Sequence, residues 1–349
     1  MKTTYYFLGA LAMFALASCS NDQETEFNKT GSISFRSAIG TRATETTTAN
    51  LKEFKVSAFL NNAPFFNSLT FTKGEDDLFV SSPVYNWPGD GSNLDFYAYS
   101  PMNPRGTLTL NDNQKVLADF SPETNPQNQV DFITADTIGN KDTNAGVGVP
   151  LTFKHRLSQI VVRAKSDNKA YIFKVTGVKI ANVKSTGSFD FSSKKWTLQD
   201  ALADYSENYN DTITLGATPV NIMDKVGGPM MLIPQQLTGW NNDTDKTNSQ
   251  NGAYLAVKLQ INTVAGAQVF PFPSDAKTVW AAIPIKDNWE AGNCYVYNLD
   301  FTHGAGHTDP KDPTPGTPIL DGEIKFNVDV TPWAEYPVDI TPTPVSSQK

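Results

Sequence analysis

The chain has 349 residues, of which 39% are hydrophobic and 18% are charged, and its formal net charge is −8 at pH 7. The negative charge and the scattered Lys and Arg residues exclude the clustered basic surface that nucleic-acid-binding proteins use, so we expect no nucleic-acid partner. One hydrophobic core rarely organises a chain of this length, which predicts two domains.

The first residues have the order of an export signal. Lys2 is followed by an uncharged apolar stretch over residues 5–17, which is shorter than the roughly 20 residues that a membrane-spanning helix needs. The stretch leads into Leu16-Ala17-Ser18-Cys19, which is similar to the bacterial lipobox, where the cysteine is acylated and becomes the new N-terminus. We predict a signal peptide over residues 1–18 and a lipid on Cys19 that binds the precursor to a membrane.

The next predicted element is a strand over residues 32–39, followed by a polar, Thr-rich segment that runs to Thr48 and contains Arg42. Proteases bind extended backbone in exposed polar loops, so Arg42 is either a solvated side chain or a site of trypsin-like cleavage before Ala43. Cleavage there would separate residues 19–42, which include the first strand, from the rest of the protein. A groove would then be left where that strand had been.

Short segments with strand character fill most of the remaining chain. Residues 54–60 alternate apolar and polar side chains, which is the period of a half-buried strand. Further segments rich in Val, Ile, Phe, Tyr and Thr recur at residues 94–99, 157–164, 173–183, 254–261, 279–285 and 294–301. Turns rich in Gly, Pro and Asn separate these segments. This alternation of short strands and turns predicts an all-β chain of tandem β-sandwich domains, with one short helix over residues 199–205.

Two changes in composition suggest where the domains end. A loop of low apolar content at residues 139–148 precedes a strong strand that opens at Val149, and we expect the domain boundary there. A Pro-rich stretch at residues 309–318 is expected to be stiff and extended. The predicted units are a signal peptide at 1–18, a lipidated segment at 19–42, domains at 43–148 and 149–308, a linker at 309–322 and a terminal strand segment at 323–349.

The last predicted strand follows this linker and carries four apolar residues on one face. They are Ile324, Phe326, Val328 and Val330. A strand in this position has two possible partners. It can complete the sheet of the second domain, or it can add to an open sheet edge of a neighbouring subunit, where main-chain hydrogen bonds hold it and its apolar side chains fill pockets.

Side chains suited to catalysis are few. Of the three histidines, His155 lies in a strand-opening stretch, where we expect a structural role. His303 and His307 have Asp309 and Asp312 nearby, but a Gly/Pro-rich loop lacks the flanking order that fixes ligand geometry. The phosphate-binding glycine loop, the zinc-binding His-Glu-x-x-His helix and the nucleophile elbow are missing from the sequence. We expect no enzymatic activity, no bound metal and no cofactor.

A surface lipoprotein that stays anchored and binds glycan is an alternative of a different class. It would need exposed aromatic rings that stack on sugars. The tryptophans in or beside turn-rich segments are Trp87, Trp196, Trp240, Trp289 and Trp333, whereas Trp280 is expected in a core. The competing explanation, which we prefer, is that all six tryptophans seal the ends of the sandwiches.

Several short stretches spread over the chain carry a further signal. They are the lipobox, Ile33-Ser34-Phe35 before residues 40–44, Asn86-Trp87-Pro88, and residues 94–101, 151–157 and 326–333. Together they resemble the fimbrillin family of Bacteroidetes, the lipoprotein precursors of type V pilus subunits.

The resemblance implies two transthyretin-like Greek-key β-sandwich domains and export to the outer membrane surface as a lipoprotein. It also implies cleavage at Arg42 by an arginine-specific protease and assembly with other pilus subunits by strand exchange. The candidate donor strand would be residues 324–330. Stalk, tip and anchor subunits all occur in this family, and a host or bacterial surface glycan or protein is a possible further partner.

Overall fold

The structure is a computed structural model that describes residues 31–39, 51–74, 76–223, 228–241, 251–272, 279–312, 316–320 and 322–333. Almost all of the regular secondary structure in the described residues consists of strands, which confirms the predicted all-β class. Two short helices, η1 (Pro126–Asn128) and α1 (Lys141–Asn144), interrupt them. No helix within these ranges is long and apolar enough to cross a membrane.

The strands up to His155 are β1 (Phe35–Ile39), β2 (Glu53–Leu60), β3 (Ala63–Lys73), β4 (Phe79–Ser81), β5 (Leu94–Ser100), β6 (Thr107–Leu110), β7 (Lys115–Phe120), β8 (Ile133–Gly139) and β9 (Val149–His155). Those that follow are β10 (Ser158–Lys165), β11 (Tyr171–Lys184), β12 (Gly187–Asp190), β13 (Lys195–Leu198), β14 (Leu202–Thr214), β15 (Val220–Asn221), β16 (Met230–Leu232), β17 (Tyr254–Thr263), β18 (Gln268–Phe270), β19 (Trp280–Pro284), β20 (Asn293–Asp300), β21 (His307–Thr308) and β22 (Lys325–Pro332).

The first sheet closes on itself in the order β1-β4-β3-β2-β5-β8-β9, because β1 pairs with both β4 and β9. Its strands alternate as the sequence predicts, since β5 turns Leu94, Phe96 and Ala98 inward. The core of this sheet is strongly aromatic. Its phenylalanines that are at most 1% exposed are Phe35, Phe54, Phe71, Phe79, Phe96 and Phe153.

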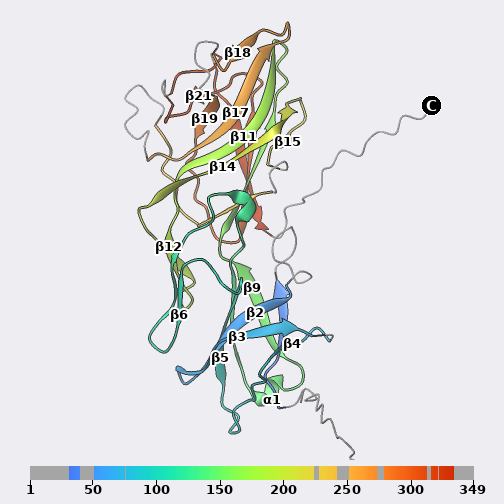
Figure 1. The fold of residues 1–349 in the computed structure, drawn as a ribbon, viewed down its shortest axis with the longest axis vertical. Helices are drawn as coiled ribbons and strands as arrows, with labels where there is room; N and C mark the ends of the chain where they lie inside the picture. The colour runs from blue at the N-terminus through green and yellow to red at the C-terminus, as the bar shows by residue number, and fades with distance from the viewer. Residues whose placement is uncertain are drawn as a thin grey trace, which may run out of the picture.

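Two sheets form the second half of the protein and pack on one core. One has the order β14-β11-β17-β19-β21, and the other has the order β15-β10-β20-β22. Inward side chains such as Ile160 and Val162 of β10 meet Val178 and Ile180 of β11, which is a sandwich arrangement. Figure 1 shows the two halves end to end along the long axis, with β2 to β5 near one end and β11, β17 and β19 toward the other.

A third sheet joins the two halves. It has the order β13-β12-β7-β6, so β7 of the first half pairs directly with β12 of the second. An aromatic cluster below it also mixes the halves, because Phe120 and Phe132 pack with Phe189 and Trp333. The halves are therefore connected by a continuous sheet and a shared core, which the expectation of two tandem domains did not include.

The structure corrects the predicted domain boundary at residue 149. Strand β9 pairs in parallel with β1 and antiparallel with β8, so Val149–His155 is the last strand of the first sheet. The chain enters the second half at β10. The strand signal at Val149 was correct, but a local pattern does not indicate which sheet a strand joins.

The helix predicted over residues 199–205 is also wrong. This stretch is a turn followed by the start of β14, and Tyr205 lies opposite Ile180 of β11 with its side chain buried. A single helical turn would gain little, whereas pairing along β11 satisfies the backbone and buries the tyrosine ring. Long-range pairing decides the conformation of this segment.

The described residues of the stretch 309–322 do not form the extended linker that its prolines predict. In its described part, Gly316 N–H donates to the Thr308 carbonyl, and Ile319 N–H donates to the Gly306 carbonyl at 2.8 Å. The Ile319 side chain is fully buried. The chain thus folds back beside β21 before it reaches β22.

Candidate functional site

Strand β1 fills the space between β4 and β9 in the first sheet. It pairs with β9 at five successive positions, from Phe35 opposite Val149 to Ile39 opposite Phe153, but with β4 only at Phe79. Just before the strand, Ile33 N–H donates to the Tyr85 carbonyl at 2.8 Å. Removing β1 would therefore open the sheet and expose the edge of β9.

Phe35 is the side chain that anchors β1 in the core. It is fully buried, and its ring lies edge-on to Phe71 at 4.7 Å and to Phe96 at 5.1 Å between ring centres. The close approach of β1 requires a glycine at position 148, where φ is +76° and a Cβ would lie 3.2 Å from the Phe35 carbonyl carbon. The pocket around Phe35 is thus shaped by aromatic side chains and by backbone.

Strand β22 contains the predicted donor residues and pairs with β20 of the same chain. Eight residue pairs run antiparallel, from Lys325 opposite Asp300 to Pro332 opposite Asn293. No other strand among the described residues pairs with the free edge of β22. Within this structure the strand therefore completes its own sheet, which is the first of the two arrangements that the sequence left open.

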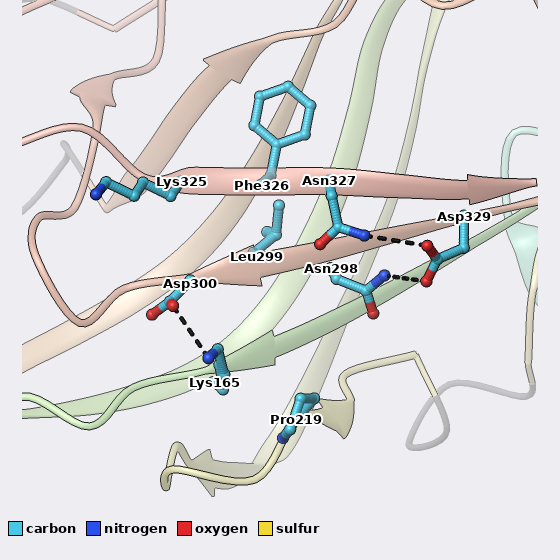
Figure 2. Close-up of a pocket in the computed structure, with 9 residues that line it drawn as sticks. All are labelled: Lys165, Pro219, Asn298, Leu299, Asp300, Lys325, Phe326, Asn327 and Asp329. Carbon is cyan, nitrogen blue, oxygen red and sulfur yellow. Dashed lines mark hydrogen bonds and ion pairs between the residues drawn. The ribbon is translucent and has the colours of Figure 1, made fainter.

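The four apolar residues of the terminal strand segment share one face, as predicted. Val328 lies opposite Tyr297 and Phe326 lies opposite Leu299, so this face points toward the second core. Ile324 is 5% exposed, but Phe326 is 40% and Val330 is 53% exposed, because β22 lies at the rim of the sheet. Figure 2 shows Phe326 and Leu299 on the same side of the paired strands.

Polar side chains hold the opposite face of this strand pair. Asn298 donates from Nδ2 to Asp329 at 2.8 Å across the strands, and Lys165 of β10 pairs with Asp300 at 3.1 Å (Figure 2). Together with Pro219 and Lys325, these four polar residues line a surface pocket of about 450 Å³.

The core side of the strand pair carries a buried tyrosine. Burial and the neighbouring Asp287 raise the pKa of Tyr297, so its hydroxyl stays protonated and donates to Asp287 at 2.7 Å.

The asparagine contact predicts a measurable loosening of β22. In an Asn298→Ala variant we expect amide hydrogen exchange in β22 to accelerate about two- to fivefold, because one exposed hydrogen bond contributes only modestly. The measurement is exchange followed by mass spectrometry of the peptides that cover 325–332. Asn208→Ala, which removes an exposed asparagine from β14, is the control. Equal exchange in both variants would contradict the prediction.

Trp333, the residue directly after β22, is buried between the two halves of the protein. Trp333 is 1% exposed, and its ring stacks on His155 with 4.4 Å between ring centres and 12° between planes. His155 Nδ1 lies 2.7 Å from the buried carboxylate of Asp131. The structural role expected for His155 agrees with this position, but the sequence held no signal for its contact with Trp333, which lies far along the chain.

Most of the tryptophans that could have stacked on a glycan are buried. Trp87, Trp240, Trp289 and Trp333 are 1–6% exposed, and Trp196 is half-buried in the shared cluster, where its Nε1 donates to the Arg156 carbonyl. Trp280, which was expected in a core, is partly buried and packs against the cluster that contains Trp240 and Tyr254, with Lys179 Nζ over its ring. The aromatic surface on which the glycan-binding alternative depended is therefore missing at these five described positions.

The other predicted site residues are distributed as follows. Cys19, Arg42 and Ala43 lie outside the described residues. His307 packs near the Trp240 ring, and the Asp309 carboxylate is engaged by Lys179 and Tyr254. Within the described ranges, no three His, Cys, Asp or Glu side chains are grouped so that they could hold a metal ion.

Comparison with known proteins decides the family. Residues 41–333 match the family described as fimbrillin-like. The chain belongs to the fimbrillin-like family. This fimbrillin-like protein is 26% identical over 315 residues to the fimbrium subunit Fim1C of Phocaeicola vulgatus, with 73% of this chain and 80% of the relative covered.

Solved structures agree with the fold. A fimbrial protein from Bacteroides vulgatus has a TM-score of 0.58 at 15% identity, with 86% of this chain and 99% of that chain covered. A protein from Bacteroides uniformis described as a cell adhesion protein has a TM-score of 0.50 at 16% identity, with 87% and 98% covered. The predicted family and the all-β fold are thus confirmed. Family membership makes this protein a structural and adhesive pilus subunit at the cell surface, with other subunits as its partners.

Proposed function

We propose that this fimbrillin-like protein is exported as a lipoprotein precursor, is cut after Arg42, and then polymerises by donor-strand exchange. The observation that carries the proposal is the position of β1. It closes the first sheet, it is the first described strand, and Arg42 follows Ile39 by three positions. A cut at Arg42 would detach the lipid on Cys19 and free β1 to leave its groove.

The groove would be an effective acceptor for another strand. Without β1, residues 149–153 of β9 lose their pairing partner, and the pocket lined by Phe71 and Phe96 loses Phe35. An open sheet edge beside apolar pockets recruits a strand through main-chain hydrogen bonds, while alternate side chains fill the pockets. The partner that fits is a strand with the apolar spacing of β1.

The terminal strand segment has that spacing. In a common register the pairs are Ile33 with Ile324, Phe35 with Phe326, Ser37 with Val328, and Ile39 with Val330. The isoleucine and phenylalanine match residue for residue. A valine in place of Ser37 adds apolar surface, and each buried methylene contributes about 0.8 kcal/mol. The donor from another copy would therefore bind the groove at least as well as the strand it replaces.

Pairing with β20 would store the donor strand until a groove opens. In that state Phe326 and Val330 stay 40% and 53% exposed, so their transfer into the groove of another copy would bury surface that is now in water. Moving β22 away from β20 breaks the hydrogen bonds between these strands and the stacking of Trp333 on His155. New main-chain hydrogen bonds to β9 would offset the loss to β20. We assign the protein no catalytic role toward other molecules.

An Arg-specific protease tests the proposal. We expect that treatment of the lipid-free precursor removes the residues up to Arg42 and produces ladders of oligomers that resist detergent on gels run without boiling. The matched control is Arg42→Lys, which keeps the charge but not the cleavage site and should stay monomeric. A wild-type protein that is fully cut at Arg42 and remains a monomer at high concentration would overturn strand exchange.

A further inference from the structure

A lysine and an aspartate from distant parts of the chain meet in the second half. Lys179 of β11 pairs with Asp309, which follows β21, and their side chains are only 12% and 1% exposed. The register places Lys179 opposite Ala256 of β17, and Ala256 opposite Ala282 of β19. These two small side chains leave room along the row for the lysine side chain to reach Asp309 across the sheet.

The surroundings of this pair are aromatic. Lys179 Nζ lies 4.7 Å from the centre of the Trp280 ring and 5.5 Å from the centre of the Tyr254 ring. The two rings and the low exposure of both side chains limit the access of water to the contact between Nζ and the carboxylate. An amine beside a carboxylic acid is the starting pair for amide formation.

Hydrogen bonds also fix the orientation of the Asp309 carboxylate relative to Lys179 Nζ, the atom that would attack it. Its Oδ1 accepts hydrogen bonds from the Tyr254 hydroxyl and from the Lys311 backbone N–H, both at 2.8 Å, while Oδ2 faces Lys179 Nζ. Burial first, and then the nearby Asp309, raise the pKa of Tyr254 well above its ordinary value, so the tyrosine keeps its proton. Two fixed donors on one oxygen are the arrangement that stabilises the oxyanion of a tetrahedral intermediate.

We propose that Lys179 and Asp309 condense to an intramolecular isopeptide bond within the folded protein. The ammonium first gives a proton to Oδ2, and the neutral Nζ then attacks Cγ while Oδ1 takes the negative charge beside Tyr254. A second proton passes from Nζ to the Oδ2 hydroxyl, which leaves as water as the C=O bond re-forms. The net reaction converts an ammonium and a carboxylate into one amide and one water, with no oxidant or cofactor.

The bond would connect the inner strand β11 to the segment that leads to β22. If β22 is held by a neighbouring subunit, which rests on the proposed function, a pull on the fibre reaches Asp309 through residues 310–324. The cross-link would pass that pull to β11, so that the short strand β21 is not peeled from the sheet edge. The chemistry itself does not depend on strand exchange.

Peptide mass spectrometry of the full-length protein purified from cells tests the inference. Trypsin does not cut after an acylated lysine, so we expect residues 175–184 joined to residues 287–311, with a mass lower than their sum by about 18 Da, one water. If the protein yields only residues 175–179, 180–184 and 287–311 as separate, unmodified peptides, the inference is wrong. This result is independent of any assembly assay, so its failure would leave the proposed function standing.

Variants separate the covalent bond from the ion pair. Lys179→Arg keeps the charge pair but cannot form the amide, and we expect it to lose the cross-linked peptide and to lower Tm by about 10 °C. Tyr254→Phe removes one donor to Oδ1 and should leave a larger uncross-linked fraction. Lys165→Arg, in the more exposed pair with Asp300, should change neither the peptide nor Tm. An unchanged Tm in Lys179→Arg together with separate peptides in the wild type would identify a simple salt bridge.

Discussion

Replacing Phe35 with alanine should lower the free energy of unfolding of the uncleaved precursor by about 3–5 kcal/mol. The Phe35 ring is fully buried among the rings of Phe54, Phe71 and Phe96. Truncation leaves a cavity in a tightly packed aromatic core, and the edge-to-face contacts are lost with it. Urea unfolding of the precursor at equilibrium measures the effect.

The control for this prediction is Phe326→Ala. Phe326 is 40% exposed at the rim of the second core, so its truncation should cost about 1 kcal/mol or less of the precursor's stability. Residue 35 departs if Arg42 is cut, so Phe35→Ala and wild type should then give the same processed chain and the same polymer. A loss below about 1 kcal/mol in the Phe35→Ala precursor would show that β1 is not an anchored part of the sheet.

Replacing Phe326 with aspartate should abolish polymerisation and leave the processed monomer folded. In the monomer the side chain reaches water, so the substitution is tolerated. In the proposed polymer it would place a carboxylate in the pocket between Phe71 and Phe96, and burying an unpaired charge costs several kcal/mol. We expect oligomer ladders to fall at least about 100-fold after cleavage, because about 2.7 kcal/mol corresponds to that factor.

The matched control adds the same charge to the other face of the strand. In the common register Asn327 corresponds to Arg36, whose side chain is exposed in β1, so Asn327→Asp should polymerise nearly as well as wild type. Phe326→Leu should retain most of the assembly because the pocket still receives an apolar side chain. Normal ladders from Phe326→Asp would exclude the proposed register, and equal loss in both aspartate variants would point to a general charge effect.

Local patterns were sufficient to predict most individual strands. The alternation in residues 54–60 and the β-branched and aromatic runs at 173–183 and 254–261 became β2, β11 and β17. The failure at residues 199–205 has a physical cause, because a short amphipathic segment fits one helical turn as well as the start of a strand. Its pairing partner β11 lies outside any local window.

The candidate site was predictable in part. The face shared by Ile324, Phe326, Val328 and Val330 follows from the two-residue period of a strand and agrees with the register to β20. Two contacts could not be predicted from the sequence: the stacking of Trp333 on His155 and the ion pair of Lys179 with Asp309. Each joins residues more than a hundred positions apart. Such contacts depend on which strands become neighbours.

The sequence by itself determined the all-β class, the family, and the spacing that makes β1 and β22 alike, because periodicity and motifs are local properties of the chain. The tertiary structure alone decided that β9 belongs to the first sheet, that the halves share the sheet of β6, β7, β12 and β13, and that residues 316–320 fold back beside β21. The physical reason is that hydrogen-bond partners and core contacts are chosen among all strands of the chain at once.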